Sequence, residues 1–294
     1  MPDFPMTMIP AILIHNVVSL RAEPQGDSEQ VSQGILGDRV LILEERGDFA
    51  RIRTGDAYEG WVWRRHLRPL DPANPYDALW PFSRRSPSAW RVSADAAQLC
   101  TIPCEVSTLR TQCVYGTWLQ PIRTLSGWYG ICHLVRVPSS DRSGYTTAYV
   151  HDDDVVRERE ENTFGIPKIC AISYRFIGTP YLWGGSTPFG FDCSGFVQHL
   201  YAMCGVTLPR DAYLQAQSPL GRDLPPEETP QKGDLVFFLG PKDPRKRGIT
   251  HVGMALDAER FIHAVSKDGV IITPFDDPYY SRLYTYRGAW RYNA

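Results

Sequence analysis

The sequence predicts an α+β protein in which two small all-β barrels precede a domain that begins with helices and ends in antiparallel strands. Its 294 residues exceed the length of one small domain, and 43% hydrophobic and 22% charged residues are typical of globular proteins. Short strand-like runs between turn signals fill the first half, whereas helical periodicity followed by strand-like runs fills the second. We therefore expect domains at residues 1–75, 76–157 and 158–294, with a Pro-rich linker at 71–87.

Composition and charge exclude several functional classes. The formal net charge of −2 argues against a non-specific nucleic-acid binder. The first residues lack a basic segment, and the apolar run 9–14 is too short for a signal sequence or a membrane span. We expect a cytoplasmic protein without membrane insertion, with a leader trimmed from the chain as the alternative. Seven cysteines lack the pattern of a disulfide-rich secreted protein, so reduced thiols are expected.

The first two domains contain two copies of one strand pattern. The first domain has the strand-like runs VVSLRAEP, VLILEE, FARIRT and GWVWRRHL, separated by Gly-Asp turn signals. Residues 47–52 echo 127–132, and residues 60–62 echo 148–150, with an insertion around 137–144 in the second copy. The pattern indicates a duplicated small barrel. Its closing G-W/Y-V strand resembles that of tandem bacterial SH3-like domains.

The third domain begins with two predicted helices. Apolar residues recur at helical spacing over 165–178. A second helix starts at Cys193 after a Gly-rich loop, with Asp192 as a suitable N-cap. Gly205 is a suitable stop for that helix. The predicted strands follow at residues 234–238, 251–256, 261–264, 270–272 and 287–292.

Cys193 is the candidate nucleophile. In the first turn of a helix, the helix dipole and unpaired N–H groups favour the thiolate form of a cysteine. His251 and His263 lie twelve residues apart, on either side of a predicted turn at 257–260. Because twelve is even, both imidazoles face the same side of a hairpin and lie near each other. One can act as the base while the other orients it, and the Tyr181 hydroxyl and the Cys193 backbone N–H are candidate oxyanion donors.

Several motifs together resemble the NlpC-type cysteine peptidases of bacterial cell-wall metabolism. They are GTPYLWGG at 178–185, FDCSGF at 191–196, LPRD at 208–211, KGDLVFF at 232–238, HVG at 251–253 and FIHA at 261–264. The resemblance implies a papain-like α+β core with Cys193 as the nucleophile and His251 as the base. It implies His263 as the third polar residue and Tyr181 as part of the oxyanion hole. It also implies hydrolysis of the amide between γ-D-glutamate and a diamino acid in peptidoglycan stem peptides.

Two SH3-like domains ahead of such a core resemble the murein-peptide recycling subgroup, the γ-D-glutamyl-L-diamino acid endopeptidases. In that subgroup the first SH3-like domain leaves room only for a free N-terminal L-alanine, held partly by an acidic side chain. The resemblance suggests Glu59 as this anchor, with a plain surface residue as the alternative. Asp192, Ser194 and Asp211 are further candidates for substrate contacts, although Asp192 could be only a helix cap. Ala212 replaces a hydroxyl residue of some relatives, so a hydrogen bond to D-glutamate is missing or supplied elsewhere.

Two other functions are compatible with the same sequence. The protein could hydrolyse intact peptidoglycan, with the SH3-like domains as wall anchors, although the expectation of a protein without an export signal argues against this function. It could also bind wall peptides without cleaving them, although Cys193, His251 and His263 occur together. The charged loop at 241–247 is either solvated or borders the cleft and attracts substrate carboxylates.

No metal or other cofactor is expected. The acidic run 152–154 lacks the alternating ligands and the glycine of a calcium loop, so a solvated turn is expected there. Five residues of the second domain have side chains that could suggest zinc: Cys100, Cys104, Cys113, Cys132 and His133. Their spacing fits no common zinc motif, and we expect ordinary thiols.

Overall fold

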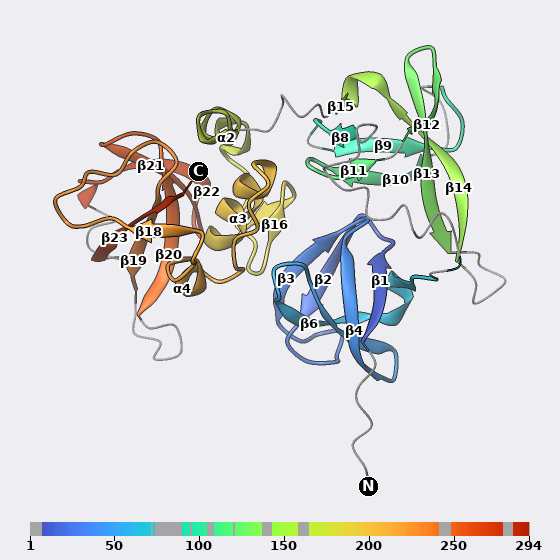
Figure 1. Cartoon of the computed structure of the whole chain (residues 1–294), viewed down its shortest axis with the longest axis horizontal. Helices are drawn as coiled ribbons and strands as arrows, with labels where there is room; N and C mark the ends of the chain where they lie inside the picture. The colour runs from blue at the N-terminus through green and yellow to red at the C-terminus, as the bar shows by residue number, and fades with distance from the viewer. Residues whose placement is uncertain are drawn as a thin grey trace, which may run out of the picture. The chain divides into compact units, whose positions relative to one another are not determined.

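The computed structural model describes residues 8–71, 73, 90–94, 96–104, 109–119, 121–136, 143–157, 165–240, 248–278 and 285–293. The chain forms two compact units, Met1–Asn162 and Thr163–Ala294 (Figure 1). Most of the Pro-rich segment 71–87, the inserted residues 137–142 and the charged loop 241–247 lie outside the described residues.

The first half of the N-terminal unit is an antiparallel sheet of seven strands. They are β1 (Ile9–Leu13), β2 (Val17–Arg21), β3 (Gln30–Ile35), β4 (Arg39–Arg46), β5 (Phe49–Arg53), β6 (Glu59–Trp63) and β7 (Leu67–Pro69), in the spatial order β3-β2-β6-β5-β4-β1-β7. Buried and half-buried side chains alternate along β2, as expected for a sheet with one face in the core. The core includes Leu20, Ile52 and Val62. All four strand-like runs of the first domain are therefore strands of this sheet.

The second half of the N-terminal unit repeats part of this arrangement. Its strands are β8 (Trp90–Val92), β9 (Ala96–Cys100), β10 (Leu109–Val114), β11 (Trp118–Leu119), β12 (Pro121–Leu125), β13 (Trp128–Arg136), β14 (Ser143–His151) and β15 (Val155–Arg157), in a five-stranded and a three-stranded sheet. The repeated motifs occupy equivalent hairpins, because β5 pairs with β6 as β13 pairs with β14. Each hairpin leads into a 3-10 turn, η1 (Arg64–His66) or η2 (Asp152–Asp154), and then a short strand. The structure confirms the internal repeat.

The C-terminal unit combines short helices with an antiparallel sheet. Its elements are α2 (Ile166–Ser173), η4 (Tyr174–Phe176), β16 (Ser186–Thr187), β17 (Gly190–Phe191), α3 (Cys193–Met203), α4 (Ala212–Gln215), β18 (Gly221–Asp223), β19 (Leu235–Leu239), β20 (Ile249–Ala255), β21 (Arg260–Val265), β22 (Gly269–Pro274) and β23 (Thr285–Tyr292). The sheet has the order β18-β23-β19-β20-β21-β22, and α3 packs against β20 and β21 (Figure 1). This architecture confirms the predicted α+β class.

The predicted elements of this unit are present, with differences at their ends. The helix expected over 165–178 is α2, which ends at Ser173 and continues as the 3-10 turn η4. Gly178 follows with a φ of 85°, a conformation that glycine adopts without strain. The strand that carries His251 begins two residues earlier than expected, at Ile249. The sequence did not predict β18 and α4, because elements of three or four residues give no periodic signal.

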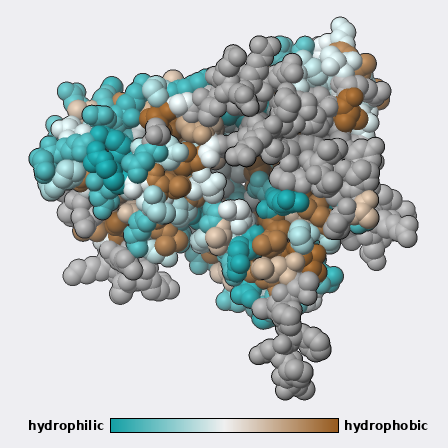
Figure 2. Space-filling model, in the orientation of Figure 1, coloured by the Kyte–Doolittle hydropathy of each residue, from teal (hydrophilic) through white to brown (hydrophobic). Residues whose placement is uncertain are grey.

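On the coloured part of the visible surface, hydrophilic and hydrophobic areas are interspersed (Figure 2). Two exposed aromatic side chains, Trp183 and Phe189, lie on the loop before α3 and are 52% and 50% exposed. In the ranges that the structure describes, no helix has both the length and the hydropathy needed to cross a membrane.

Candidate active site

Cys193 is the first residue of α3, and glycines allow the preceding loop to pack closely against this helix end. Asp192 caps the helix, because its Oδ1 accepts the backbone N–H of Gly195 at 2.7 Å. Its Oδ2 accepts the N–H of Gly184 at 3.0 Å, so one carboxylate joins the loop to the helix. A Cβ atom on Gly195 would collide with the carbonyl oxygen of Gly185. The Gly-rich loop therefore serves close packing at the start of α3.

The thiol of Cys193 is buried and held in its neutral form. The residue is 8% exposed, and burial raises the pKa of its thiol to about 12, assisted by the negative charge of Asp192. Backbone hydrogen bonds with Val252 and Ser194, and the charge of Arg210, lower the pKa without cancelling this effect. The helix position predicts a thiolate, whereas burial of the sulfur in this structure favours the neutral thiol. Cys193 therefore needs a base to become a nucleophile.

His251 and His263 form a buried hydrogen-bonded pair, as their even spacing predicts. His251 Nε2 lies 2.7 Å from His263 Nδ1. The register of β20 and β21 pairs Ala255 with Phe261, which places the two histidines diagonally on one face of the sheet. Burial lowers the pKa of His251 to about 4. Burial, with a contribution from His251, also lowers the pKa of His263 well below its usual range. Both rings are neutral near pH 7, and His251 can accept a proton.

One threonine and two phenylalanines lie around this pair. His263 Nε2 lies 2.8 Å from the Oγ1 atom of Thr273 on β22. The ring centroid of Phe261 lies 4.6 Å from that of His263, and the centroid of Phe238 lies 5.8 Å from that of His251. These apolar rings contribute to the desolvation that lowers both pKa values. Thr273 reaches His263 only through the register of β21 and β22, so no local sequence pattern identifies it.

The backbone of β20 connects the cysteine to the histidines. A backbone hydrogen bond links Val252 to the Cys193 thiol, and Val252 directly follows His251 in the chain. Because His251 Nε2 faces His263, we expect Nδ1 to be the ring nitrogen that serves Cys193. The structure thus brings three predicted residues to one place, in the order of a nucleophile, a base and an orienting group. Their catalytic roles stay predictions.

Tyr181 lies beside the segment that leads to Cys193. It forms an isolated parallel bridge with Phe191, two residues before the cysteine. The N–H of Leu182 donates to the carbonyl oxygen of Phe191 at 3.0 Å, which fixes the two segments side by side. Tyr181 is half-buried. Its part in an oxyanion hole stays a prediction.

Asp192 also belongs to a buried ion pair that the sequence analysis missed. Arg210, 2% exposed, donates to Asp192 Oδ1 at 3.0 Å and to Oδ2 at 2.5 Å. It donates as well to the hydroxyl oxygen of Ser194 at 2.9 Å. Asp192 therefore acts as a helix cap and as the counterion of Arg210, and a contact with substrate stays a prediction for Asp192 and Ser194. The need of a buried carboxylate for a partner was the signal that could have identified Arg210 within the LPRD motif.

The segment after Arg210 contacts the same helix end. Asp211 precedes α4 and is half-buried, and its contact with substrate stays a prediction. Ala212, where some relatives have a hydroxyl, is buried. Gln215 is fully buried and donates to the carbonyl oxygens of Ser194 at 3.1 Å and Pro209 at 2.9 Å. This amide joins α4 to the first turn of α3.

Glu59 belongs to the N-terminal unit, where it begins β6. Its Oε1 accepts hydrogen bonds from Arg53 Nε at 2.9 Å and Nη2 at 2.7 Å. Its Oε2 accepts a longer one from Arg51 Nη1 at 3.5 Å. The Glu59 side chain is 34% exposed, so this cluster is in contact with solvent. The role of Glu59 as an anchor for the substrate stays a prediction.

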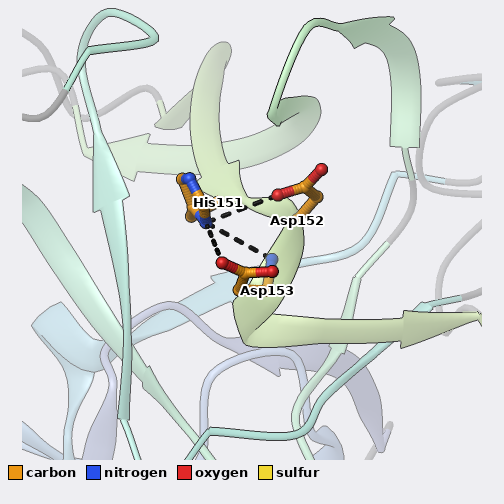
Figure 3. A group of neighbouring side chains, drawn as sticks. All are labelled: His151, Asp152 and Asp153. Atoms are coloured by element: carbon orange, nitrogen blue, oxygen red, sulfur yellow. Dashed lines mark hydrogen bonds and ion pairs between the residues drawn. The ribbon is translucent and has the colours of Figure 1, made fainter.

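The described residues contain one group that could hold a metal ion, formed by His151, Asp152 and Asp153 (Figure 3). His151 Nδ1 lies 3.4 Å from Asp152 Oδ1 and 3.5 Å from Asp153 Oδ2. The same nitrogen accepts the backbone N–H of Asp153 at 3.3 Å and so caps the turn η2. The side chain of Asp153 is 89% exposed, in agreement with the solvated turn expected at 152–154.

The cysteines of the second domain do not form a metal site within the described part of the chain. The side chains of Cys132 and His133, which were considered for zinc, lie outside that part. The described free cysteines are Cys100, Cys104, Cys113, Cys170, Cys193 and Cys204. Burial raises the pKa of Cys113 beyond its usual range, as expected for an inert core thiol.

Both units of the chain resemble known proteins. Residues 178–289 match the NlpC/P60 family, and residues 20–67 match the bacterial dipeptidyl-peptidase SH3 domain. The gamma-D-glutamyl-L-lysine dipeptidyl-peptidase of Bacillus subtilis is 37% identical over 242 residues, which cover 79% of this chain and 71% of that protein. The protein of the same name from Bacillus cereus is 28% identical over 273 residues, or 89% of this chain and 74% of that one.

A solved structure supports the same fold. The crystal structure of a NlpC/P60 family protein from Bacillus cereus matches with a TM-score of 0.75 at 24% identity, over 96% of this chain and 99% of that chain. The NlpC/P60 match spans Cys193 and both histidines, and the Bacillus subtilis relative is matched over most of its length. The chain therefore belongs to the NlpC/P60 family of cysteine peptidases.

Proposed function

We propose that the protein is a cell-wall peptidase that hydrolyses the γ-D-glutamyl–diamino acid amide of free murein peptides. In this proposal the substrate has an unblocked N-terminal L-alanine, as in peptidoglycan recycling. The observation that carries the proposal is the buried array of Cys193, His251 and His263, in which the thiol contacts the backbone next to the base. The names of the two Bacillus relatives, gamma-D-glutamyl-L-lysine dipeptidyl-peptidase, support this class of bond.

The geometry supports a two-step acyl transfer. His251 Nδ1 takes the proton of the Cys193 thiol as the sulfur attacks the γ-carbonyl carbon of the D-glutamyl residue, and the carbonyl electrons move onto oxygen. When the carbonyl re-forms, the C–N bond breaks and His251 returns the proton to the leaving amine. The product is a thioester on Cys193. Water, deprotonated by His251, then attacks the thioester, and the thiol leaves with the proton.

The neutral state of the resting pair fits this sequence of steps. An imidazole with a pKa of about 4 is unprotonated near pH 7 and can accept a proton. A neutral thiol in a buried site avoids the cost of an isolated charge until the substrate is bound. Proton transfer and nucleophilic attack then occur together, and the oxyanion donors, for which Tyr181 is proposed, receive the developing charge.

Cleavage of synthetic peptides followed by mass spectrometry tests the proposal. The substrates are L-Ala-γ-D-Glu with diaminopimelate or L-lysine as the third residue, each with a free and with an N-acetylated amino terminus. We expect cleavage of the free forms between D-glutamate and the diamino acid. The Cys193→Ala variant should lose roughly 10⁴-fold or more of the turnover, because the nucleophile is removed. Cys204→Ala, a half-buried thiol at the other end of α3, is the matched control and should retain full activity.

Each result supports or contradicts a defined part of the proposal. Equal cleavage of free and acetylated peptides would contradict recycling of free peptides and favour action on intact peptidoglycan. Cleavage by Cys193→Ala at the native rate would rule out Cys193 as the nucleophile. Binding of these peptides without any cleavage would favour a binding protein in place of an enzyme.

A further inference from the structure

We propose that Thr273 is a positioning residue that keeps the lone pair of His251 Nδ1 directed to Cys193. This inference deepens the proposed function and rests on it. Thr273 acts through His263, and its hydroxyl is the last group that the described residues show in a buried series of hydrogen bonds across three strands. The sequence motifs do not include Thr273.

The three side chains lie on neighbouring strands of one antiparallel sheet. His251 is on β20, His263 on β21 and Thr273 on β22. The distances are 2.7 Å from His251 Nε2 to His263 Nδ1 and 2.8 Å from His263 Nε2 to Thr273 Oγ1. The three residues are 4%, 0% and 2% exposed. Water is therefore excluded from this series of hydrogen bonds. The ring nitrogens of both histidines must find their hydrogen-bond partners inside the protein.

Counting protons along the chain gives two arrangements. In the first, His251 carries its proton on Nε2 and donates it to Nδ1 of His263, whose own proton is on Nε2 and points to the Thr273 oxygen. His251 Nδ1 then has a lone pair for the thiol proton. In the second arrangement every bond is reversed, so that Thr273 donates to His263, which donates to His251. His251 then carries its proton on Nδ1 and cannot act as the base for Cys193.

Thr273 makes the first arrangement possible because its hydroxyl oxygen accepts the N–H of His263. Without an acceptor at this point, the active arrangement would leave a buried N–H group without a partner, a state that folded proteins avoid. The first arrangement is also required when His251 becomes an imidazolium, since its Nε2–H then needs the lone pair of His263. If His251 were protonated in the second arrangement, its Nε2–H and the Nδ1–H of His263 would face each other across 2.7 Å.

Packing and strand preference do not explain why residue 273 has a hydroxyl group. Thr273 pairs in register with Phe261, whose ring packs between Phe238 and Phe275 at centroid distances of 5.0 Å. Valine has nearly the same shape as threonine and an equal preference for strands, and it would suit this apolar layer without the cost of burying a hydroxyl. The hydrogen bond to His263 accounts for the choice of threonine.

The experiment compares Thr273→Val and Thr273→Ser in the full chain. We expect Thr273→Val to lower kcat by about 10-fold to 100-fold, the effect of one buried unpaired donor, with KM within about 2-fold of the native value. Thr273→Ser keeps the hydroxyl and should restore kcat to within about 3-fold. The matched control is Thr250→Val. The hydroxyl of Thr250, on β20, makes no hydrogen bond within the described residues, so this variant should leave kcat unchanged.

A second measurement reads the proton positions without relying on activity. In ¹⁵N-histidine NMR of the full chain, assigned with His263→Asn, native His263 should show a protonated Nε2 and an unprotonated Nδ1. Thr273→Val should shift His263 toward a protonated Nδ1. A native pattern in Thr273→Val, or a native kcat in that variant, would overturn the proposal. If the native enzyme cleaves none of the peptides, the proposed function fails, but the NMR pattern still decides whether Thr273 sets the tautomer.

Discussion

Asp192 and Glu59 are both carboxylates that meet arginines, but the two pairs lie in different surroundings. The Asp192–Arg210 pair is buried, with side chains that are 10% and 2% exposed, whereas those of Glu59 and Arg53 are 34% and 40% exposed. Opposite charges attract each other more strongly inside a protein, but their removal from water costs more as well. Breaking the buried pair should therefore lower the free energy of unfolding strongly. The exposed pair contributes only about 0 to 1 kcal/mol to that free energy.

The difference indicates which carboxylate can exchange its partner. Oxygen Oδ1 of Asp192 accepts hydrogen bonds from Gly195, Ser194 and Arg210, so a substrate that takes this oxygen must displace part of the α3 cap. Glu59 meets only arginine side chains that are themselves in contact with water, among the contacts that the structure shows for it. Two carboxylates that are both predicted to contact the substrate thus differ greatly in their freedom to change partners.

Removal of Arg210 should have the largest effect. Arg210→Met leaves the carboxylate of Asp192 buried without its counterion, and we expect the C-terminal unit to lose about 3 to 5 kcal/mol of stability. Arg53→Met, the matched change at Glu59, should cost at most about 1 kcal/mol in the N-terminal unit. Hydrogen exchange of the full chain, followed for each unit by mass spectrometry, gives both values in one type of experiment.

A double variant sharpens this result. Asp192→Asn combined with Arg210→Met removes both charges, so part of the lost stability should return. Equal losses in Arg210→Met and Arg53→Met would contradict the contrast between the two pairs.

The buried histidine pair should give the next largest effect, through pH. The pKa of His251 falls from the usual 6.5 to about 4 on folding, so the unfolded chain binds more protons between these pH values. The contribution of neutral His251 to the free energy of unfolding is therefore fully present above pH 6.5. It falls by roughly 3 kcal/mol as the pH decreases toward 4. Hydrogen exchange in the C-terminal unit at pH 7 and pH 4.5, corrected for the intrinsic exchange rates, measures this loss. The His251→Gln variant should show a clearly smaller loss, and the same loss in both proteins would contradict this origin.

Local patterns were sufficient to predict much of the site. The N-cap and the stop of α3 follow from Asp192 and Gly205, because capping depends on residues within one turn. The contact between His251 and His263 follows from an even spacing across a tight turn. Both features depend on short stretches of chain, in which geometry is nearly fixed by residue type.

The features that were missed depend on packing between distant segments. Arg210 reaches Asp192 across 18 residues of chain without a regular period, and Thr273 lies opposite Phe261 in register and reaches His263 only diagonally. The expected thiolate at Cys193 was wrong for a related reason. The helix dipole can be inferred from position, whereas desolvation depends on how completely the rest of the fold covers the sulfur.

Neutralising Glu59 should have the smallest effect on stability and a larger one on substrate preference. Glu59→Gln breaks exposed ion pairs only, so the N-terminal unit should lose at most about 1 kcal/mol, and less at 1 M salt because of screening. If the anchor role of Glu59 holds, the preference in kcat/KM for the free over the N-acetylated peptide should fall about 10-fold, the value of one charged hydrogen bond. Glu44→Gln is the control, because Glu44 is 31% exposed and pairs with Arg46 and Arg51 in the same sheet. An unchanged preference in Glu59→Gln, or an equal change in both variants, would contradict the anchor role, since only a carboxylate that meets the substrate ammonium can separate the two peptides.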